Sequence, residues 1–211
     1  MGVGALAAAA ALKREMDAGG IPGTVRYYGC PAEETLVGKV FMVKAGLFAD
    51  VDAAITWHPG AMNMVWNHSS NAMNSVKFTF HGRTAHAAGD PHHGRSALDA
   101  VELMNIGANY LREHIIEKAR IHYVITDGGG EPNVVPARAQ VWYYVRAPER
   151  AQVDEIYERL LNVARGAALM TDTTFEVQFL AGCYNYLPNR TINGLLHKYM
   201  EQVGPCRWTE E

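Results

Sequence analysis

The order of strand-like and helix-like segments between residues 75 and 180 limits the possible folds more than any other feature of the sequence. Residues 75–81 alternate polar and apolar side chains with a period of two, which is typical of a strand with one exposed face. Further elements are predicted in the order helix, strand, strand, helix and strand, over residues 96–114, 120–126, 139–146, 152–170 and 174–180. This β-α-β-β-α-β order predicts a ferredoxin-like α+β domain, in which two helices cover one face of a four-stranded antiparallel sheet.

The first 66 residues have a different pattern. An alanine-rich segment predicts a buried helix over residues 5–18, which ends at Gly19-Gly20. Short β-type runs at residues 25–28 and 53–57 flank a predicted helix at 35–45. This alternation predicts parallel strands with helices. Because two strands bury too little surface to be stable alone, the segment is expected to be part of an α/β domain.

The composition excludes several classes of protein. With 48% hydrophobic residues in 211 and a net charge of −3, the chain is expected to be globular, and nucleic acid is not an expected partner. The apolar run at residues 2–12 is too short to cross a bilayer, so no membrane association is expected. The cysteines Cys30, Cys183 and Cys206 form no CxxC pair, which indicates a reducing, cytoplasmic location. Cys30 could be a nucleophile, but no neighbouring feature activates it, and an inert thiol is the expected alternative.

Two adjacent carboxylates, Glu33 and Glu34, follow the first β-type run, and His58 follows the second. The carboxyl ends of neighbouring parallel strands meet at one crevice, so these side chains are predicted to lie close together. One carboxylate could bind a metal ion while the other accepts a proton from water. A catalytic zinc-type site needs about three protein ligands, and Glu34 with His58 makes two. The alternative is that the doublet is only the solvated start of a helix, and that His58 is a packed or surface histidine.

Two loops of the second domain carry further polar candidates. His86 lies among small residues after the first strand, and a loop with two more histidines, His92 and His93, follows it. A histidine-rich loop of this kind is often only a surface loop. The glycine-rich segment before Asn133 could form an ordinary turn, or it could present Asn133 as a hydrogen-bond donor. Arg146, on the strand that follows, could hold a carboxylate with two parallel hydrogen bonds.

Several of these motifs together resemble the M20 family of metallopeptidases and amidohydrolases. The resemblance covers essentially the whole chain and keeps its order. Within the family, residues 28–34 and 96–105 are similar to the group of aminobenzoyl-glutamate utilisation protein B. The motifs are Pro31-Ala32-Glu33-Glu34, His58-Pro59, Gly82-Arg83-Thr84-Ala85-His86-Ala87-Ala88 and Asn133-Val134-Val135-Pro136 with Arg146 downstream.

The resemblance implies a role for each candidate residue. Glu33 would be the general base, and Glu34 and His58 would be metal ligands. His86 would reach into the site of the partner protomer and stabilise the oxyanion, while Asn133 and Arg146 would hold the terminal carboxylate of the substrate. Residues 1–69 would be a partial metal-binding catalytic domain, residues 70–181 a lid or dimerisation domain, and residues 182–211 a return into the catalytic domain.

The resemblance also implies the cofactor, the substrate and the partner. Two divalent cations, manganese or zinc, would activate water for cleavage of an amide bond in a small N-acyl amino acid such as p-aminobenzoyl-glutamate. The protein would form a homodimer through the lid domain.

The sequence departs from the family pattern at both ends. Family members have an upstream Gly-His motif that supplies further ligands and a late histidine, and neither is found in these 211 residues. The chain is therefore expected to be truncated at both ends and to hydrolyse little alone. A non-catalytic dimerisation module is the main alternative, and a small-molecule-sensing ferredoxin-like domain is a third.

Overall fold

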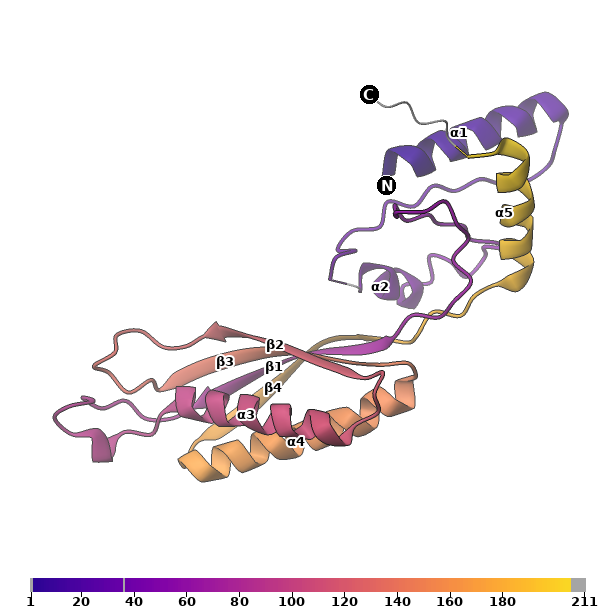
Figure 1. The fold of residues 1–211 in the computed structure, drawn as a ribbon. Helices are drawn as coiled ribbons and strands as arrows, with labels where there is room; N and C mark the ends of the chain where they lie inside the picture. Colours follow the sequence, from indigo (N-terminus) through magenta and orange to yellow (C-terminus); the bar gives the residue numbers. More distant parts are fainter. Residues whose placement is uncertain (1, 36, 206–211) are drawn as a thin grey trace, which may run out of the picture. The chain divides into compact units, whose positions relative to one another are not determined.

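The chain forms two units in the computed structural model, which describes residues 2–35 and 37–205 (Figure 1). The sheet unit comprises residues His68–Pro188. The helical unit comprises the described residues up to Asn67 and those from Asn189 onward.

The sheet unit has the predicted order of elements. Its four strands form one antiparallel sheet in the order β2-β3-β1-β4. Helix α3 follows β1, and helix α4 lies between β3 and β4. The elements are β1 (Ala72–His81), the 3₁₀-helix η1 (Pro91–His93), α3 (Ala97–Leu111), the 3₁₀-helix η2 (Arg112–His114), β2 (Arg120–Asp127), β3 (Arg138–Ala147), α4 (Arg150–Thr171) and β4 (Thr174–Cys183).

Both helices cover the same face of this sheet (Figure 1). Alternate residues of β1 and β3 point toward them and are fully buried. The prediction that β1 has one exposed face is wrong, because Ser75 and Thr79 on its other face are also buried. The strand lies between β3 and β4, and the side chains of Trp142 and Gln140 hydrogen-bond to Ser75 and Thr79. The ring of Phe78 meets that of Tyr143 edge-on, with centroids 5.8 Å apart. The Tyr143 hydroxyl donates a hydrogen bond to the side-chain oxygen of Asn105 on α3, so its polar atom is satisfied inside the core. The main core residues are Val76, Phe78, Phe80, Val101, Met104, Val141, Tyr143, Val145, Val153 and Leu160.

Local signals in the sequence set the ends of both helices. The Ser96 hydroxyl accepts a 3.1 Å hydrogen bond from the backbone N–H of Asp99 and so caps the N-terminus of α3. Helix α4 begins with a reciprocal capping box between Glu149 and Gln152. It ends at Asp172, which takes the left-handed conformation with φ 52°.

The helical unit differs from its prediction. It contains α1 (Gly2–Gly19), α2 (Gly38–Lys44) and α5 (Arg190–Val203), and its described residues form no strand. The predicted parallel strands at residues 25–28 and 53–57 are therefore wrong. A parallel pair leaves most backbone groups unpaired and buries little apolar surface, so it gains too little to form by itself.

The prediction of a buried first helix is also wrong. No described residue of α1 is buried, and Val3 is 84% exposed. Alanine favours helix formation through its backbone preference without needing to be packed. The composition therefore predicted the helix correctly but not its environment.

Side-chain contacts hold the segment around Arg26 in place of strand pairing. The guanidinium of Arg26 donates two hydrogen bonds, of 2.6 and 2.5 Å, to the carboxylate of Asp50. The Tyr28 hydroxyl donates a 2.7 Å bond to the carbonyl oxygen of Leu47, and its ring packs against Phe48. The segment is thus tied beside the residues that follow α2.

Two further sequence inferences concern membranes and cysteines. Among the described residues, no helix combines the length and apolar character needed to cross a bilayer. Cys30 and Cys183 are free and half-buried, and burial raises the pKa of the Cys183 thiol. Cys206 lies outside the described residues.

Candidate functional site

Glu33 and Glu34 lie in a tight turn just before α2. Glu33 is half-buried and Glu34 is exposed, and the Thr35 hydroxyl donates a 2.8 Å hydrogen bond to the carbonyl oxygen of Ala32. The start of α2 lies so close to this turn that a Cβ on Gly38 would be 1.8 Å from the Pro31 carbonyl oxygen. Only glycine allows that approach. Gly38 therefore holds the carboxylate turn against the helix, a role that no pattern in the sequence indicated.

His58 is exposed in the extended segment after the second β-type run. Its Nδ1 lies 2.7 Å from the carbonyl oxygen of Pro59. A carbonyl oxygen can only accept, so Nδ1 carries the proton and the lone pair of Nε2 is free. Metal-binding histidines commonly have this arrangement, in which the second ring nitrogen donates to a carbonyl.

The described part of the chain adds no third ligand to Glu34 and His58, the two metal ligands predicted from the sequence. Among residues 2–35 and 37–205, no group of three or more close ligand side chains includes Glu34 or His58. The carboxylate and imidazole donors suit a divalent cation in kind, but a catalytic centre needs about three ligands.

His86 and Asn133, far apart in the sequence, are brought together in the sheet unit. A short antiparallel bridge joins His86 to Val134. The backbone N–H of Ala87 donates a 2.9 Å hydrogen bond to the carbonyl oxygen of Asn133, and that of Val135 donates a 3.0 Å bond to Ala85. The loop after β1 and the loop before β3 therefore form one rigid support for both side chains, which are exposed.

The imidazole of His86 is held in one tautomer by its own loop. Its Nδ1 accepts hydrogen bonds from the backbone N–H groups of Ala88 (3.2 Å) and Gly89 (3.0 Å). Because Nδ1 is an acceptor, the neutral ring carries its proton on Nε2. His86 can thus offer an N–H donor at the nitrogen that its loop does not use.

Arg146 lies at the other end of the sheet from His86 and Asn133. It is the ninth of ten residues in β3, which spans roughly 30 Å at about 3.3 Å per residue, whereas Asn133 precedes the first residue of that strand. The Arg146 side chain is half-buried, its guanidinium lies 5.4 Å from the centre of the Tyr144 ring, and its Nε is buried without a hydrogen-bond partner among the described residues.

Arg120 and His122 lie beside Arg146 on the face of the sheet that the helices leave open. Arg120 is directly opposite Arg146 in the ladder, and His122 is opposite Tyr144. Burial lowers the pKa of His122, and the guanidinium groups of Arg146, Arg112 and Arg120 lower it further. None of these three arginines forms an ion pair with a carboxylate in the described part of the chain. This cationic group could not be recognised from the sequence, because the register of the strands follows only from the structure.

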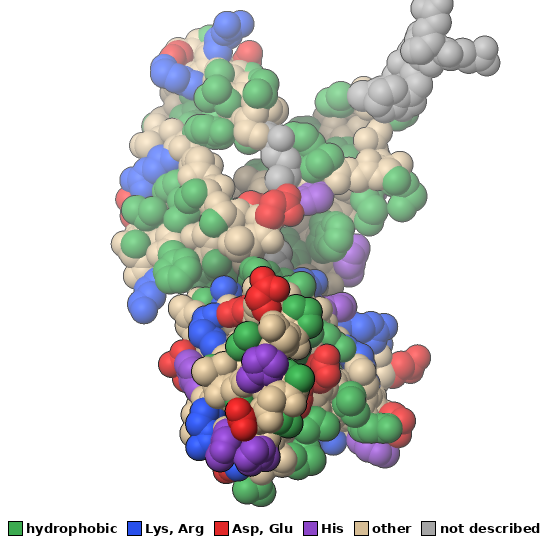
Figure 2. Space-filling model, turned by 90° about the vertical axis from the view of Figure 1, so that its left-hand side faces the viewer, with side chains coloured by type: hydrophobic (Ala, Val, Ile, Leu, Met, Phe, Trp, Pro, Cys, Tyr) green, Lys and Arg blue, Asp and Glu red, His purple; other side chains and the backbone are tan. Residues whose placement is uncertain are grey.

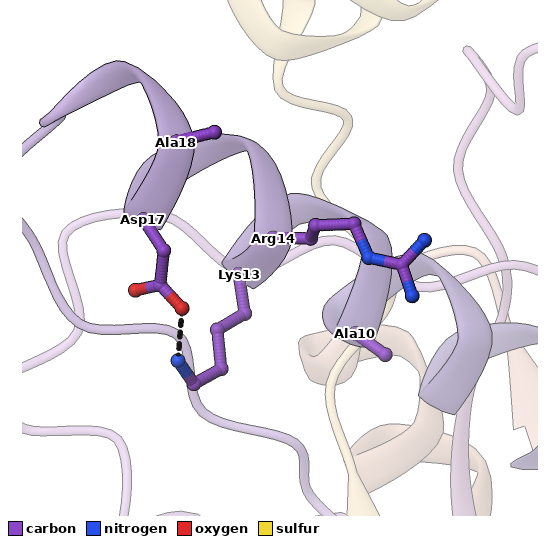
Figure 3. Close-up of a pocket in the computed structure, with 5 residues that line it drawn as sticks. All are labelled: Ala10, Lys13, Arg14, Asp17 and Ala18. Carbon is purple, nitrogen blue, oxygen red and sulfur yellow. Dashed lines mark hydrogen bonds and ion pairs between the residues drawn. The ribbon is translucent and has the colours of Figure 1, made fainter.

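A separate surface hollow runs along α1 and is lined by Ala10, Lys13, Arg14, Asp17 and Ala18 (Figure 3). Lys13 and Asp17 form an ion pair across one helical turn. All five residues belong to a single exposed helix, so the hollow is open and cannot surround a ligand. It contains none of the predicted site residues.

Comparison with known proteins agrees with these motifs. The peptidase dimerisation domain of the M20 family matches residues 69–170. The B subunit of the p-aminobenzoyl-glutamate hydrolase of Escherichia coli is 51% identical over 100% of this chain and 44% of its own length. The Xaa-Arg dipeptidase of Mus musculus is 32% identical over 89% of this chain and 44% of its length.

The solved structures give a similar result. An aminobenzoyl-glutamate utilisation protein from Klebsiella pneumoniae matches with a TM-score of 0.61 and 27% identity, over 77% of this chain and 43% of that one. A hydantoinase/carbamoylase family amidase from Burkholderia ambifaria shares the fold at 15% identity, with a TM-score of 0.55, over 64% of this chain and 34% of that one. The chain thus spans less than half the length of each of these relatives. Its sequence identity, its motifs and its dimerisation domain together show that it belongs to the M20 family of peptidases and amidohydrolases.

Proposed function

We propose that this chain is part of a metal-dependent amidohydrolase that cleaves the amide bond of an N-acyl amino acid such as p-aminobenzoyl-glutamate. The observation that carries the proposal is the opposed placement of the polar residues in the sheet unit, with His86 and Asn133 at one end and Arg146 at the other. The substrate is suggested by the E. coli relative, whose name states that activity.

The domain roles follow the resemblance. Residues 1–69 and 182–211 would belong to the metal-binding catalytic domain, and residues 70–181 would form the lid. The division of the chain near Asn67 and Pro188 supports these boundaries. The strand order β2-β3-β1-β4, with both helices on one face, supports a ferredoxin-like lid.

Glu34 and His58 would be two of the ligands for a pair of divalent cations, manganese or zinc. When bound, such cations would lower the pKa of the attacking water and polarise the scissile carbonyl. The free Nε2 lone pair of His58 suits this role. Since two ligands are too few, we expect the 211-residue chain alone to bind catalytic metal weakly and to hydrolyse little.

Glu33 would act as the general base. It accepts a proton from the attacking water and delivers it to the nitrogen of the departing amine. Its half-buried position beside the exposed Glu34 supports a division of roles between the two carboxylates. The turn that packs closely against Gly38 would hold the two carboxylates in fixed positions relative to each other.

His86 would stabilise the oxyanion through its Nε2–H group. Donors aimed at a developing negative charge contribute about 3 kcal/mol to the lowering of a barrier. Asn133, on the adjoining loop, would donate to the same substrate. Both side chains stand on a bridged pair of loops, which limits their motion relative to each other.

Arg146 cannot reach the same small substrate as His86 of its own chain. The strand between them is roughly 30 Å long, far longer than an N-acyl amino acid. One active site would therefore take His86 and Asn133 from one chain and Arg146 from a second copy. A dimer would be required for the complete set.

The cationic group Arg120, His122 and Arg146 would select an acidic amine product. A single guanidinium satisfies one carboxylate, whereas the two guanidinium groups of Arg120 and Arg146 can accommodate two negative charges. Arg146 would bind the carboxylate next to the cleaved amide, and Arg120 with His122 would favour a second carboxylate on the side chain. Glutamate has both groups.

The free edge of β2 would be the surface through which two copies pair. Tyr123, Val124 and Ile125 are exposed large apolar residues on this edge strand, and Ile106 and Tyr110 are exposed on α3. Uncovered edge strands with apolar side chains favour pairing with another chain. A homodimer is proposed. Pairing with a different but related chain is the competing outcome, since the relatives include two distinct subunits of a p-aminobenzoyl-glutamate hydrolase.

The proposal is tested by grafting. This chain replaces the segment that it matches in the E. coli hydrolase, which gives a grafted enzyme with the complete family architecture. The grafted enzyme should cleave p-aminobenzoyl-glutamate, and Glu33→Ala should stop turnover while metal content stays unchanged. Turnover retained by Glu33→Ala would remove Glu33 from the role of base.

A non-catalytic dimerisation module is the second candidate. It is favoured by the match of the dimerisation domain to residues 69–170 and by the incomplete ligand set. Sedimentation with metal analysis of the 211-residue chain separates the two. If the 211-residue chain forms a dimer and the grafted enzyme is inactive, these results would support the non-catalytic dimerisation module.

A cytoplasmic location is also proposed. Its support is the free state of the described cysteines Cys30 and Cys183, which suits a reducing compartment. Fractionation of cells that express the natural gene would test it.

A further inference from the structure

A group of metal-binding side chains lies at the tip of the loop between β1 and α3. Asp90, His92 and His93 each present one ligand atom, and these atoms all lie within 4.8 Å of one another. Figure 2 views the sheet unit from the end that carries η1, where histidine side chains gather beside acidic and basic ones. The group shares no residue with Glu34 and His58.

The three side chains are free to bind an ion. All three are exposed, and the described part of the chain offers no hydrogen-bond or ion-pair partner to the Asp90 carboxylate or to either imidazole. The rings of His92 and His93 lie side by side, with centroids 4.0 Å apart and a tilt of 42°. Among the described residues, no hydrogen bond or ion pair of these side chains therefore has to be broken before a cation can bind.

The backbone beneath these side chains is held in place. The N–H of Asp90 donates a 3.0 Å hydrogen bond to the His86 carbonyl oxygen, and the N–H of His93 donates a 3.1 Å bond to that of Asp90. The Nε of Arg83 donates a 2.5 Å bond to the carbonyl of His93. Gly94 packs against Val135 so closely that a Cβ on it would lie 2.9 Å from the valine side chain. The turn is thus arranged before any ligand binds.

We propose that Asp90, His92 and His93 form a binding site for a divalent transition-metal ion such as Zn²⁺. Two imidazoles and one carboxylate are donors that Zn²⁺, Ni²⁺ and Cu²⁺ accept, whereas Ca²⁺ and Mg²⁺ prefer oxygen ligands alone. Tetrahedral ligands on zinc lie about 3.4 Å apart, so small side-chain rotations close the site. A fourth position remains for water or another ligand.

Two nearby arginines set the strength of binding. Arg83 donates to the His93 carbonyl, and Arg95 donates to the carbonyl of Gly94 and forms an ion pair with Asp172. Arg95 is thereby neutralised, whereas Arg83 has no ion-pair partner among residues 2–35 and 37–205 and keeps a positive charge near the site. The exposure of the ligands and this charge should weaken binding, and replacement of Arg83 by Gln should strengthen it.

Metal binding would reach His86 through the loop. Asp90 hydrogen-bonds to the backbone of His86, and the N–H groups of Ala88 and Gly89 fix the imidazole tautomer. An ion bound by Asp90, His92 and His93 would hold together the turn from Asp90 to His93, which directly follows the N–H donors of Ala88 and Gly89. The expected consequence is slower opening of the loop that positions His86.

The test measures Zn²⁺ binding to the full 211-residue chain by competition with a chromophoric chelator. The His92→Asn/His93→Asn variant should lose one equivalent of Zn²⁺, or bind it at least tenfold more weakly. His114→Asn/His197→Asn, which changes two exposed histidines elsewhere, should match the wild type. Glu34→Gln/His58→Asn should keep the same equivalent, which separates this site from the proposed catalytic ligands.

Hydrogen exchange provides a second readout that is independent of activity. Zn²⁺ should slow exchange at the amides of Ala88, Gly89 and Asp90 in the wild type and in the control variants. It should have no such effect in His92→Asn/His93→Asn. Equal Zn²⁺ stoichiometry and affinity in the wild type and in His92→Asn/His93→Asn would overturn the proposal, as would protection that is independent of these histidines.

Discussion

The Nδ1 atom of His86 accepts a 3.0 Å hydrogen bond from the backbone N–H of Gly89, which leaves Nε2 as the donor nitrogen of the ring. The bridge from His86 to Val134 places Asn133 beside it. A histidine and an asparagine from two loops therefore form one polar group at one end of the sheet unit. The role of each ring nitrogen of His86 can be tested by substitution.

The tautomer of His86 predicts different effects for two amide substitutions. In His86→Asn, the side-chain oxygen can replace Nδ1 but no donor replaces Nε2–H, so kcat of the grafted enzyme should fall about 10²- to 10³-fold. In His86→Gln, the amide nitrogen approaches the position of Nε2, and the loss should be smaller. Steady-state kinetics with p-aminobenzoyl-glutamate measure both, and equal losses would argue against the Nε2 donor.

The cationic group on β2 and β3 predicts a preference for dicarboxylate products. Arg120→Gln/His122→Asn should raise KM of the grafted enzyme about tenfold for a substrate that releases glutamate, or about 1.4 kcal/mol of binding. The KM for an otherwise equal substrate that releases glycine should change much less. Similar increases for both substrates would mean that these residues only support Arg146.

His122 predicts a pH dependence of stability. Burial and then the arginine charges lower its pKa in the folded chain, whereas the unfolded chain keeps the ordinary value near 6.5. Below that pH the unfolded state binds a proton that the folded state does not, so stability falls as pH decreases from about 7 to 5. Urea unfolding at several pH values should show a smaller decrease for His122→Asn. An unchanged decrease would place the acid sensitivity elsewhere.

The core of the sheet unit predicts a large effect of truncating Phe78. This side chain is fully buried between the sheet and the helices, so Phe78→Ala should lower the free energy of unfolding by about 3–5 kcal/mol. Leu169→Ala, at a position on α4 that is 84% exposed, should change it by less than about 0.5 kcal/mol. Exchange rates of the slowest amides in β1 and β3 report this unit separately from the helical unit. Comparable effects of the two substitutions would contradict the assigned core.

The sequence predicted most of the sheet unit because its signals are local. The alternation around Phe78 and the Ser96 cap each indicate an element without reference to the rest of the chain. Register is not local, because a strand carries the same alternation whatever lies beside it. The placement of Arg120 opposite Arg146 could therefore be found only in the structure.

The helical unit was less predictable for a related reason. The β-type run around Arg26 has strand propensity, but a strand needs partners for its backbone, and the described unit supplies side-chain ties from Asp50 and Leu47 instead. Glu33 and His58 were predicted from their positions after the two β-type runs, and the family resemblance supplied their expected roles. Their local geometry, including the close approach at Gly38, had no sequence signal beyond the glycine itself.

Pairing through β2 predicts an oligomer that a single charge can disrupt. Val124 is 54% exposed on the free edge strand, so Val124→Lys should shift the 211-residue chain toward monomer in sedimentation velocity. Leu169→Lys, on an exposed part of α4 outside that edge, should leave the assembly unchanged. A shift caused by Leu169→Lys alone would place the interface on α4.

The central claim is that two copies of the chain complete one active site, and mixing two inactive variants tests it most directly. In the grafted enzyme, His86→Ala and Arg146→Gln should each abolish turnover of p-aminobenzoyl-glutamate. After random exchange of protomers, half of the dimers would be mixed, each with one intact site, so activity should recover to about a quarter of the wild-type rate. Activity that stays at the level of the two parents, although mixed dimers are present, would contradict the claim.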